Sequence, residues 1–206
     1  MDEIYSIIFN RIISGKYPAG TWLKQDNLAQ EFNISRTPIR TVLQHLDQDG
    51  LVELVPQKGA TVLPFTADEI EEIYEIRKSL ELLCLDISAS TLSIHKLLEL
   101  KERILANTNS DLQTLVELDA ELHTYIIYST GKKRLISILD QVFRLIQMFR
   151  NMGLADEDSK KSALSDHIKI INALCRRDFA DAKELMKKHI DNSKIIALSH
   201  LFKNKN

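Results

Sequence analysis

The apolar positions in the last two thirds of the chain recur with the period of an α-helix. From residue 66 onward they repeat every three or four positions in six stretches, and none alternates as a strand would. Residues suited to helix ends flank these stretches, with Ser93, Asp111 and Asp178 before a helix and Gly131 after one. Six helices of this length predict an antiparallel bundle. The predicted helices are 66–90, 93–107, 111–130, 132–150, 159–176 and 179–201.

The first third of the chain has a shorter and more mixed pattern. Apolar residues keep a helical spacing in three short stretches, 4–15, 25–32 and 35–50. Two β-prone runs follow, "LVELV" and "ATVLP", joined by the turn-forming "PQKG". Three short helices and a two-stranded ribbon predict a winged helix-turn-helix, whose second helix of the turn motif enters the DNA major groove.

A domain boundary is predicted at "LPFTADE". Pro64 ends the second β-prone run, and Thr66 with Glu69 has the spacing of a capping box that starts a new helix. The sequence therefore predicts a mainly α protein, with a winged helix-turn-helix DNA-binding domain over 1–64 and an all-α antiparallel six-helix bundle over 65–206.

The stretch "NISRTPIRTVLQHL" has the features of a DNA-reading helix. Ser35 is placed as an N-cap that accepts from a free backbone amide, and Pro38 fits the first turn because it needs no intrahelical partner there. Arg36 and Arg40 lie four apart and project from one face, beside Thr37 and the positive end of the helix dipole. The opposite face is apolar and is predicted to pack on the first two helices, through Ile39, Val42, Leu43 and Leu46.

The domain that carries this helix has no excess of positive charge. Residues 1–64 hold six Lys and Arg against seven Asp and Glu, and the whole chain has a formal net charge of -2. Any contact with DNA must therefore come from a few well-placed cations and backbone amides.

Four residues of the predicted bundle have the spacing of a metal site. Asp119 and His123 lie four apart on one helix and so point in the same direction. With a turn near Arg177, His167 and His189 stand at nearly the same height in an antiparallel hairpin, ten residues before and twelve after it. Three imidazoles and a carboxylate facing one interior suit a divalent transition metal such as zinc, nickel or manganese. The other histidines, His45, His95 and His200, lack such partners and are expected at the surface.

The remaining composition indicates a cytoplasmic protein without a membrane anchor. No apolar run approaches the roughly 20 residues that cross a bilayer, and the start "MDEIYSIIFN" is acidic where a secretory signal is basic. Cys84 and Cys175 are the only cysteines, each within an apolar helical pattern, so buried free thiols are expected in preference to a disulfide.

The first 64 residues resemble the GntR family of bacterial transcription regulators. The resemblance rests on "IISGKYPAGTWL" (12–23), "LAQEFNISRTPIR" (28–40), "LDQDGLV" (46–52) and "KGATV" (58–62). It implies operator binding, in which the family residues matching Ser35, Arg36, Thr37 and Arg40 contact phosphates and guanines and the wing glycine matching Gly59 enters the minor groove. His45 and Lys58 are weaker candidates for a DNA contact, with plain exposure as the alternative. Asp26 departs from the family, which often has arginine there, and Thr41 replaces a common glutamate.

Residues 66–206 resemble the all-helical FCD effector domain of one GntR branch. In that domain a D-x3-H pair and two later histidines hold a metal, and Asp119, His123, His167 and His189 match all four. The six-helix count is closer to the VanR-like subgroup than to the seven-helix one.

Arg77 is the last residue with a candidate role. It lies in line with the apolar positions Ile73, Leu80, Cys84 and Ile87, where a guanidinium needs a partner. Glu81, four residues later, could satisfy it locally. Alternatively, as an arginine at this place in the family suggests, Arg77 binds the carboxylate of a small organic acid effector that also ligates the metal.

The sequence thus predicts a metal-containing, effector-controlled transcription regulator, acting as a homodimer on a two-fold operator and most simply as a repressor relieved by its effector. Two other classes stay open. A metal sensor would use the same four ligands but respond to the metal itself. A metal-dependent hydrolase would need an open coordination position and a base, and only Asp119 offers a suitably placed carboxylate.

Overall fold

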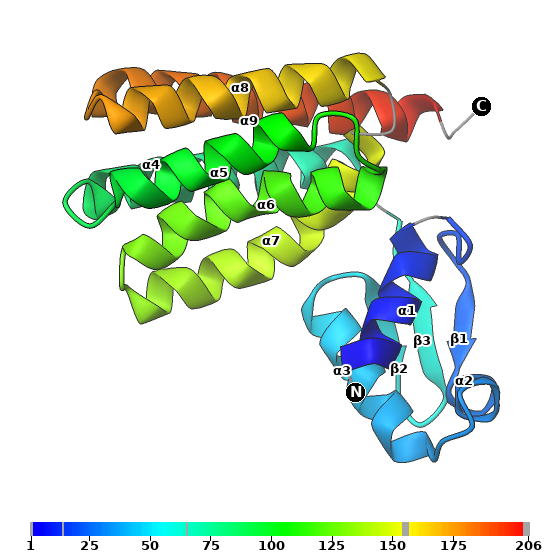
Figure 1. The fold of residues 1–206 in the computed structure, drawn as a ribbon. Coiled ribbons are helices and arrows are strands. Elements are labelled where there is room, and N and C mark those ends of the chain that lie inside the picture. The colour runs from blue at the N-terminus through cyan, green and yellow to red at the C-terminus, as the bar shows by residue number, and fades with distance from the viewer. Residues whose placement is uncertain (1, 14, 65, 154–156, 204–206) are drawn as a thin grey trace. The chain divides into compact units, whose positions relative to one another are not determined.

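The chain folds into two compact units, Met1–Thr66 and Ala67–Asn206, each with its own core. The structure is a computed structural model that describes residues 2–13, 15–64, 66–153 and 157–203 (Figure 1). No helix in these ranges is long and apolar enough to span a bilayer.

The first unit contains three helices packed on one another. They are α1 (Asp2–Ile13), α2 (Gln25–Glu31) and α3 (Arg36–Gln48). As the apolar pattern predicts, one face of each helix turns inward, and Ile8, Leu28, Ile39, Leu43 and Leu46 are among its buried residues. Asn33, between α2 and α3, has a φ of 52°, the left-handed conformation expected there, and Gly50 ends α3 with a φ of 72°.

The sheet of this unit has three strands, where the sequence predicts two. β1 (Trp22–Lys24), β2 (Val52–Val55) and β3 (Gly59–Val62) form an antiparallel sheet in the order β1-β3-β2. β2 and β3 are the predicted ribbon, and the prediction of only two strands is wrong. β1 is only three residues long, and its exposed Trp22 precedes the buried Leu23, so the sequence shows two adjacent apolar residues and no alternating run of strand length.

Gly59 closes the wing against β1. Its φ is 149°, and a Cβ at this position would lie 2.0 Å from the backbone oxygen of Leu23. Only glycine fits here, because any side chain would displace the β1–β3 pairing that holds the sheet together.

The second unit is a bundle of six described helices, as predicted to within a few residues at each end. The helices are α4 (Ala67–Ser88), α5 (Ile94–Ala106), α6 (Leu112–Ser129), α7 (Lys133–Gly153), α8 (Glu157–Cys175) and α9 (Phe179–Lys203). α4 packs against α6, α7 and α9, while α8 and α9 run side by side as a hairpin (Figure 1). Three of the helices begin at the predicted caps, because Ser93, Asp111 and Asp178 accept hydrogen bonds from the backbone amides of the first turns.

Candidate metal centre and DNA-reading helix

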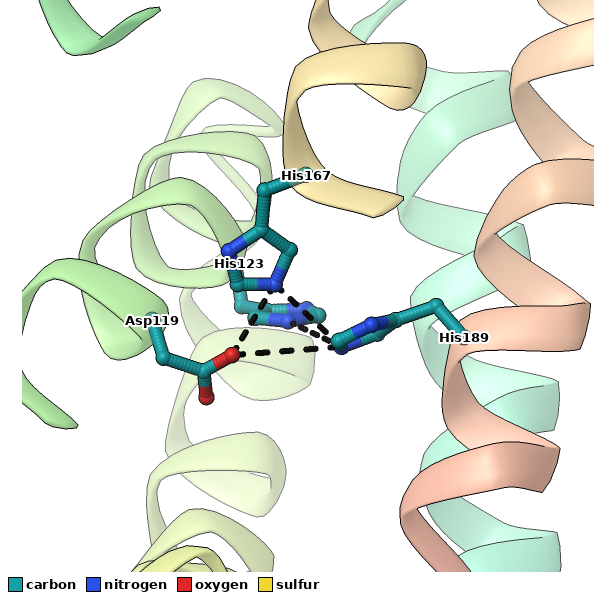
Figure 2. A group of neighbouring side chains, drawn as sticks. All are labelled: Asp119, His123, His167 and His189. Carbon is teal, nitrogen blue, oxygen red and sulfur yellow. Dashed lines mark hydrogen bonds and ion pairs between the residues drawn. The ribbon is translucent and has the colours of Figure 1, made fainter. Parts of the chain in front are cut away.

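Three helices of the bundle bring one carboxylate and three imidazoles together in its core. Asp119 and His123 come from α6, His167 from α8 and His189 from α9, and Figure 2 shows their side chains converging. All four are buried, with exposed fractions of 0–5%. One ligand atom from each lies within 4.8 Å of the others. The four residues that the sequence predicts as metal ligands therefore form one cluster.

The turn between α8 and α9 sets two of these histidines level with each other. Arg177 adopts a φ of 60° in this turn, and its guanidinium donates to the backbone oxygens of Ala89 and Leu92. The Nε2 atoms of His167 and His189 lie 3.3 Å apart, as the predicted hairpin register requires.

Three of the distances between donor atoms are close to those around a single metal ion, and because all the donor atoms lie within 4.8 Å of one another, a small inward movement of the side chains would complete the site. Oδ1 of Asp119 lies 2.9 Å from Nε2 of His167 and 4.0 Å from Nε2 of His189, and Nε2 of His123 lies 3.3 Å from Nε2 of His189. Donor atoms about 2.1 Å from a shared zinc ion are roughly 3.0–4.2 Å apart, depending on the angle between them. The cluster therefore fits a divalent ion with three nitrogen ligands and one oxygen ligand.

Burial keeps at least one of these imidazoles uncharged. Removal from water, with His167 and His123 close by, lowers the pKa of His189 well below its ordinary value near 6.5. A neutral imidazole has a nitrogen lone pair to offer, which is the form that binds metals.

Arg77 and Glu81 of α4 lie directly beside the cluster and are also buried, at 0% and 1% exposed. Nε of Arg77 donates to Oε1 of Glu81 at 2.6 Å, so the local partner suggested by the sequence is present. Nη2 of Arg77 lies 3.2 Å from Nε2 of His123, and the guanidinium packs near the rings of Tyr74 and Phe143. Nη1 of Arg77 is buried and has no hydrogen-bond partner among the described residues.

Glu81 makes a second contact that the sequence does not predict. Its Oε2 lies 2.5 Å from Nδ1 of His123. Burial alone would raise the pKa of Glu81, but its contacts with His123 and Arg77 outweigh this effect and lower the pKa to about 2. The sequence did offer one sign of this contact, because Glu81 is a second ionisable residue on the buried face of α4, four residues after Arg77.

In the first unit, α3 presents the predicted residues at its N-terminal end. Arg36, Thr37 and Arg40 are exposed, and the opposite face of the helix is buried. Ser35 occupies the N-cap position with extended backbone angles, but its side chain makes no capping hydrogen bond. The expectation that Ser35 accepts from a helix amide is therefore wrong, and its hydroxyl stays exposed at the helix end.

Asp26 of α2 and the wing turn both bear on the predicted DNA contacts of this unit. Oδ1 of Asp26 lies 2.5 Å from Nε of Arg36, so the residue that departs from the family pattern is an ion-pair partner of a predicted DNA contact. In the wing, Lys58 is exposed in the turn, whereas Gly59 is buried in the sheet. The close approach of β1 already requires glycine at position 59. The contact of Gly59 with DNA stays a prediction.

The remaining histidines are not part of the cluster that the described residues form. His45 and His95 are exposed, as expected. The side chain of His200 lies outside the described residues.

Comparison with known proteins agrees with both units. Residues 1–62 match the family described as bacterial regulatory proteins, gntR family, and residues 72–192 match the FCD domain. The chain is a GntR-family regulator with an FCD domain. GntR proteins are transcription regulators and not enzymes, so the hydrolase alternative is dropped.

Among its curated relatives, this GntR regulator is 25% identical over 194 residues to the uncharacterized HTH-type transcriptional regulator YdhC of Bacillus subtilis. The match covers 91% of this chain and 84% of YdhC. It is 22% identical over 192 residues to the HTH-type transcriptional repressor RspR of Escherichia coli, with the same coverage of 91% and 84%.

Among solved structures, the Zn2+-bound FCD domain of TM0439 matches with a TM-score of 0.57 and 23% identity. It covers 68% of this chain and 99% of that domain. The likeness shows that the two share the FCD fold.

Proposed function

We propose that this GntR–FCD protein is a repressor that binds a two-fold operator as a homodimer and is released by a small carboxylate bound at a metal in its helical bundle. The observation that carries the proposal is the buried cluster of Asp119, His123, His167 and His189 with Arg77 at its edge. The printed description of RspR as a repressor supports the direction of control. Six helices in the FCD domain favour its VanR-like subgroup.

The metal would be held by the four cluster residues through three imidazole nitrogens and one carboxylate oxygen. Zinc is favoured because the donor set and spacing suit it and because the FCD domain of TM0439 is described as Zn2+-bound. Nickel and manganese accept the same residue types. When bound, the ion supplies a positive centre to which an anionic effector can coordinate.

Arg77 is proposed to bind the effector's carboxylate. Its guanidinium lies against His123, and the buried Nη1 has no partner in the described structure. Glu81 already pairs with Nε of Arg77 and balances its charge, so the need that remains is a partner for Nη1. A small organic acid would meet this need, because one carboxylate can accept from the guanidinium and also bind a metal ion.

Operator binding is assigned to the N-terminal end of α3 and to the wing. Ser35, Arg36, Thr37 and Arg40 are exposed at the positive end of the helix dipole, where phosphates and guanine edges are attracted. We assign Lys58 at the wing turn, and the adjacent Gly59, to contacts with the DNA backbone or the DNA minor groove beside the major-groove site. Effector binding would favour a dimer arrangement whose two α3 helices no longer match the half-site spacing.

The operator-binding proposal is tested on DNA selected from a random pool by the zinc-loaded protein. Arg36→Ala and Arg40→Ala should each weaken binding to the selected sequence at least tenfold while leaving weak binding to random DNA less affected. Arg134→Ala, an exposed arginine on α7, is the control and should have no effect. Unchanged operator affinity in both α3 variants would refute the assignment.

A metal sensor is the second candidate, because four protein donors by themselves complete a tetrahedral zinc site. To separate the two candidates, DNA binding is measured as a function of free zinc concentration, with and without a panel of small organic acids. Release by an acid at constant zinc supports the effector proposal. Release that follows zinc alone, with no acid effective, supports the sensor.

A further inference from the structure

The carboxylate of Glu81 connects two groups on which the proposed function depends. Oε1 accepts from Nε of Arg77 at 2.6 Å, and Oε2 lies 2.5 Å from Nδ1 of His123. Glu81 is 1% exposed, so these contacts form away from competing water. Buried charge-assisted hydrogen bonds of this kind are strong and hold their partners in one orientation.

The contact with Glu81 determines which nitrogen of His123 carries the proton. An ionised carboxylate can only accept, so Nδ1 of His123 must donate to Glu81. Nη2 of Arg77 lies 3.2 Å from Nε2 and 3.5 Å from Nδ1 of His123, so it lies over the ring and does not decide which nitrogen carries the proton. The Glu81 contact therefore places the lone pair on Nε2, the atom that lies 3.3 Å from Nε2 of His189 inside the cluster.

We propose that Glu81 is the positioning residue of the metal centre, presetting His123 with its proton on Nδ1 and its lone pair on Nε2 toward the ion. The same carboxylate holds Arg77 next to that nitrogen, so one buried side chain aligns a metal ligand and the arginine assigned to the effector. The metal-binding half of this inference rests on the proposed function. The proton position rests on the contacts of His123 alone.

His123 differs in this respect from another histidine of the cluster. Nδ1 of His167 is buried without a hydrogen-bond partner among the described residues. The carboxylate that contacts His167 is Asp119, on Nε2, so removing the Glu81 charge should affect His123 and leave the ring of His167 as it is. A carboxylate behind a histidine ligand fixes the ring and raises its basicity, and its loss typically weakens metal binding about 10–100-fold.

The proton position is tested without any metal, by nitrogen-15 NMR of the full chain with labelled histidine rings, prepared metal-free near neutral pH. The His123 signals are assigned with His123→Asn. We expect His123 to be the Nδ1–H tautomer in the wild type and to lose that preference in Glu81→Gln. A wild-type His123 that carries its proton on Nε2, or that exchanges freely between both forms, would overturn the proposal.

The positioning role is tested by zinc affinity, measured in competition with a chelating dye. Glu81→Gln keeps the size of the side chain and should bind zinc about 10–100-fold more weakly than the wild type. Glu72→Gln removes a charge from an exposed position of the same helix and should bind as the wild type does. A Glu81→Gln protein with wild-type helical content and zinc affinity within twofold of the wild type would overturn the role.

The two measurements also separate this inference from the proposed function. A wild-type protein that binds no zinc, nickel or manganese would refute the metal centre, while the ring NMR would still decide what Glu81 does to His123. If Glu81→Gln does not fold, the wild-type tautomer alone decides the proposal.

Discussion

Asp26 at the start of α2 and Arg36 at the start of α3 form an ion pair, with Oδ1 of Asp26 2.5 Å from Nε of Arg36. The two side chains are 62% and 73% exposed, so the pair contributes little to folding. Its effect is on orientation and charge. Because Asp26 takes Nε, the two terminal nitrogens of Arg36 remain available, and a bidentate contact with guanine uses two donors.

Replacing Asp26 with asparagine should therefore change two properties in opposite directions. Affinity for random DNA should rise, because a negative charge beside the proposed contact surface is removed, and the rise should shrink as salt increases. Discrimination between the selected operator and random DNA should fall several-fold, because an uncharged amide holds Nε of Arg36 more weakly than a carboxylate does. Fluorescence anisotropy over a salt series measures both.

Glu102→Gln is the matched control for this experiment. It removes the same charge from an exposed position on α5, in the unit not assigned to DNA. If Glu102→Gln and Asp26→Asn behave alike, only net charge matters and the orienting role of Asp26 is wrong.

The sequence predicted the features that depend on residues close together in the chain and missed several that depend on distant residues. The six bundle helices are long and amphipathic, so their period is visible without knowledge of what they pack against. β1 is three residues long and exists through its pairing with β3, and no local pattern encodes that. Pairing partners of this kind are decided by tertiary structure.

The candidate site divides in the same way. The His167–His189 register followed from counting residues from a turn, and Arg77–Glu81 from a spacing of four on one helix. The Glu81–His123 contact joins residues 42 apart on different helices, so it needed the packing of α4 on α6. The Asp26–Arg36 pair and the missing cap of Ser35 depend on side-chain orientations that residue types do not fix.

Arg77 and Glu81 should be strongly coupled in stability. Arg77→Met leaves the Glu81 carboxylate buried without its guanidinium, which should lower the free energy of unfolding by about 3–5 kcal/mol. The double variant Arg77→Met with Glu81→Gln removes both charges and should recover a good part of that loss. Urea denaturation followed by circular dichroism is measured for Arg77→Met, Glu81→Gln and the double variant. Additive losses would show that the two residues do not stabilise each other.

The two thiols should differ in reactivity. Both are free, as the sequence predicts, but only Cys84 is fully buried, while Cys175 is partly exposed. Burial raises the pKa of Cys84 to about 12 and also raises that of Cys175. At pH 8 iodoacetamide should therefore label Cys175 slowly and Cys84 only after unfolding, as mass spectrometry of the digested protein would reveal. Labelling of Cys84 in the folded protein would mean that the core of α4 opens readily.

Metal binding should stabilise the bundle to an extent that depends on all four ligands. Zinc at about one hundred times its dissociation constant should add roughly 2.7 kcal/mol to the free energy of unfolding, because the ligands come together only in the folded chain. Thermal unfolding with zinc and with excess chelator measures this as a shift in Tm. His189→Ala should lose the shift, whereas His95→Ala, at an exposed position on α5, should keep it. A wild-type Tm that does not respond to zinc, nickel or manganese would mean that the cluster is a hydrogen-bonded polar core, with Asp119 and the three imidazoles satisfying one another.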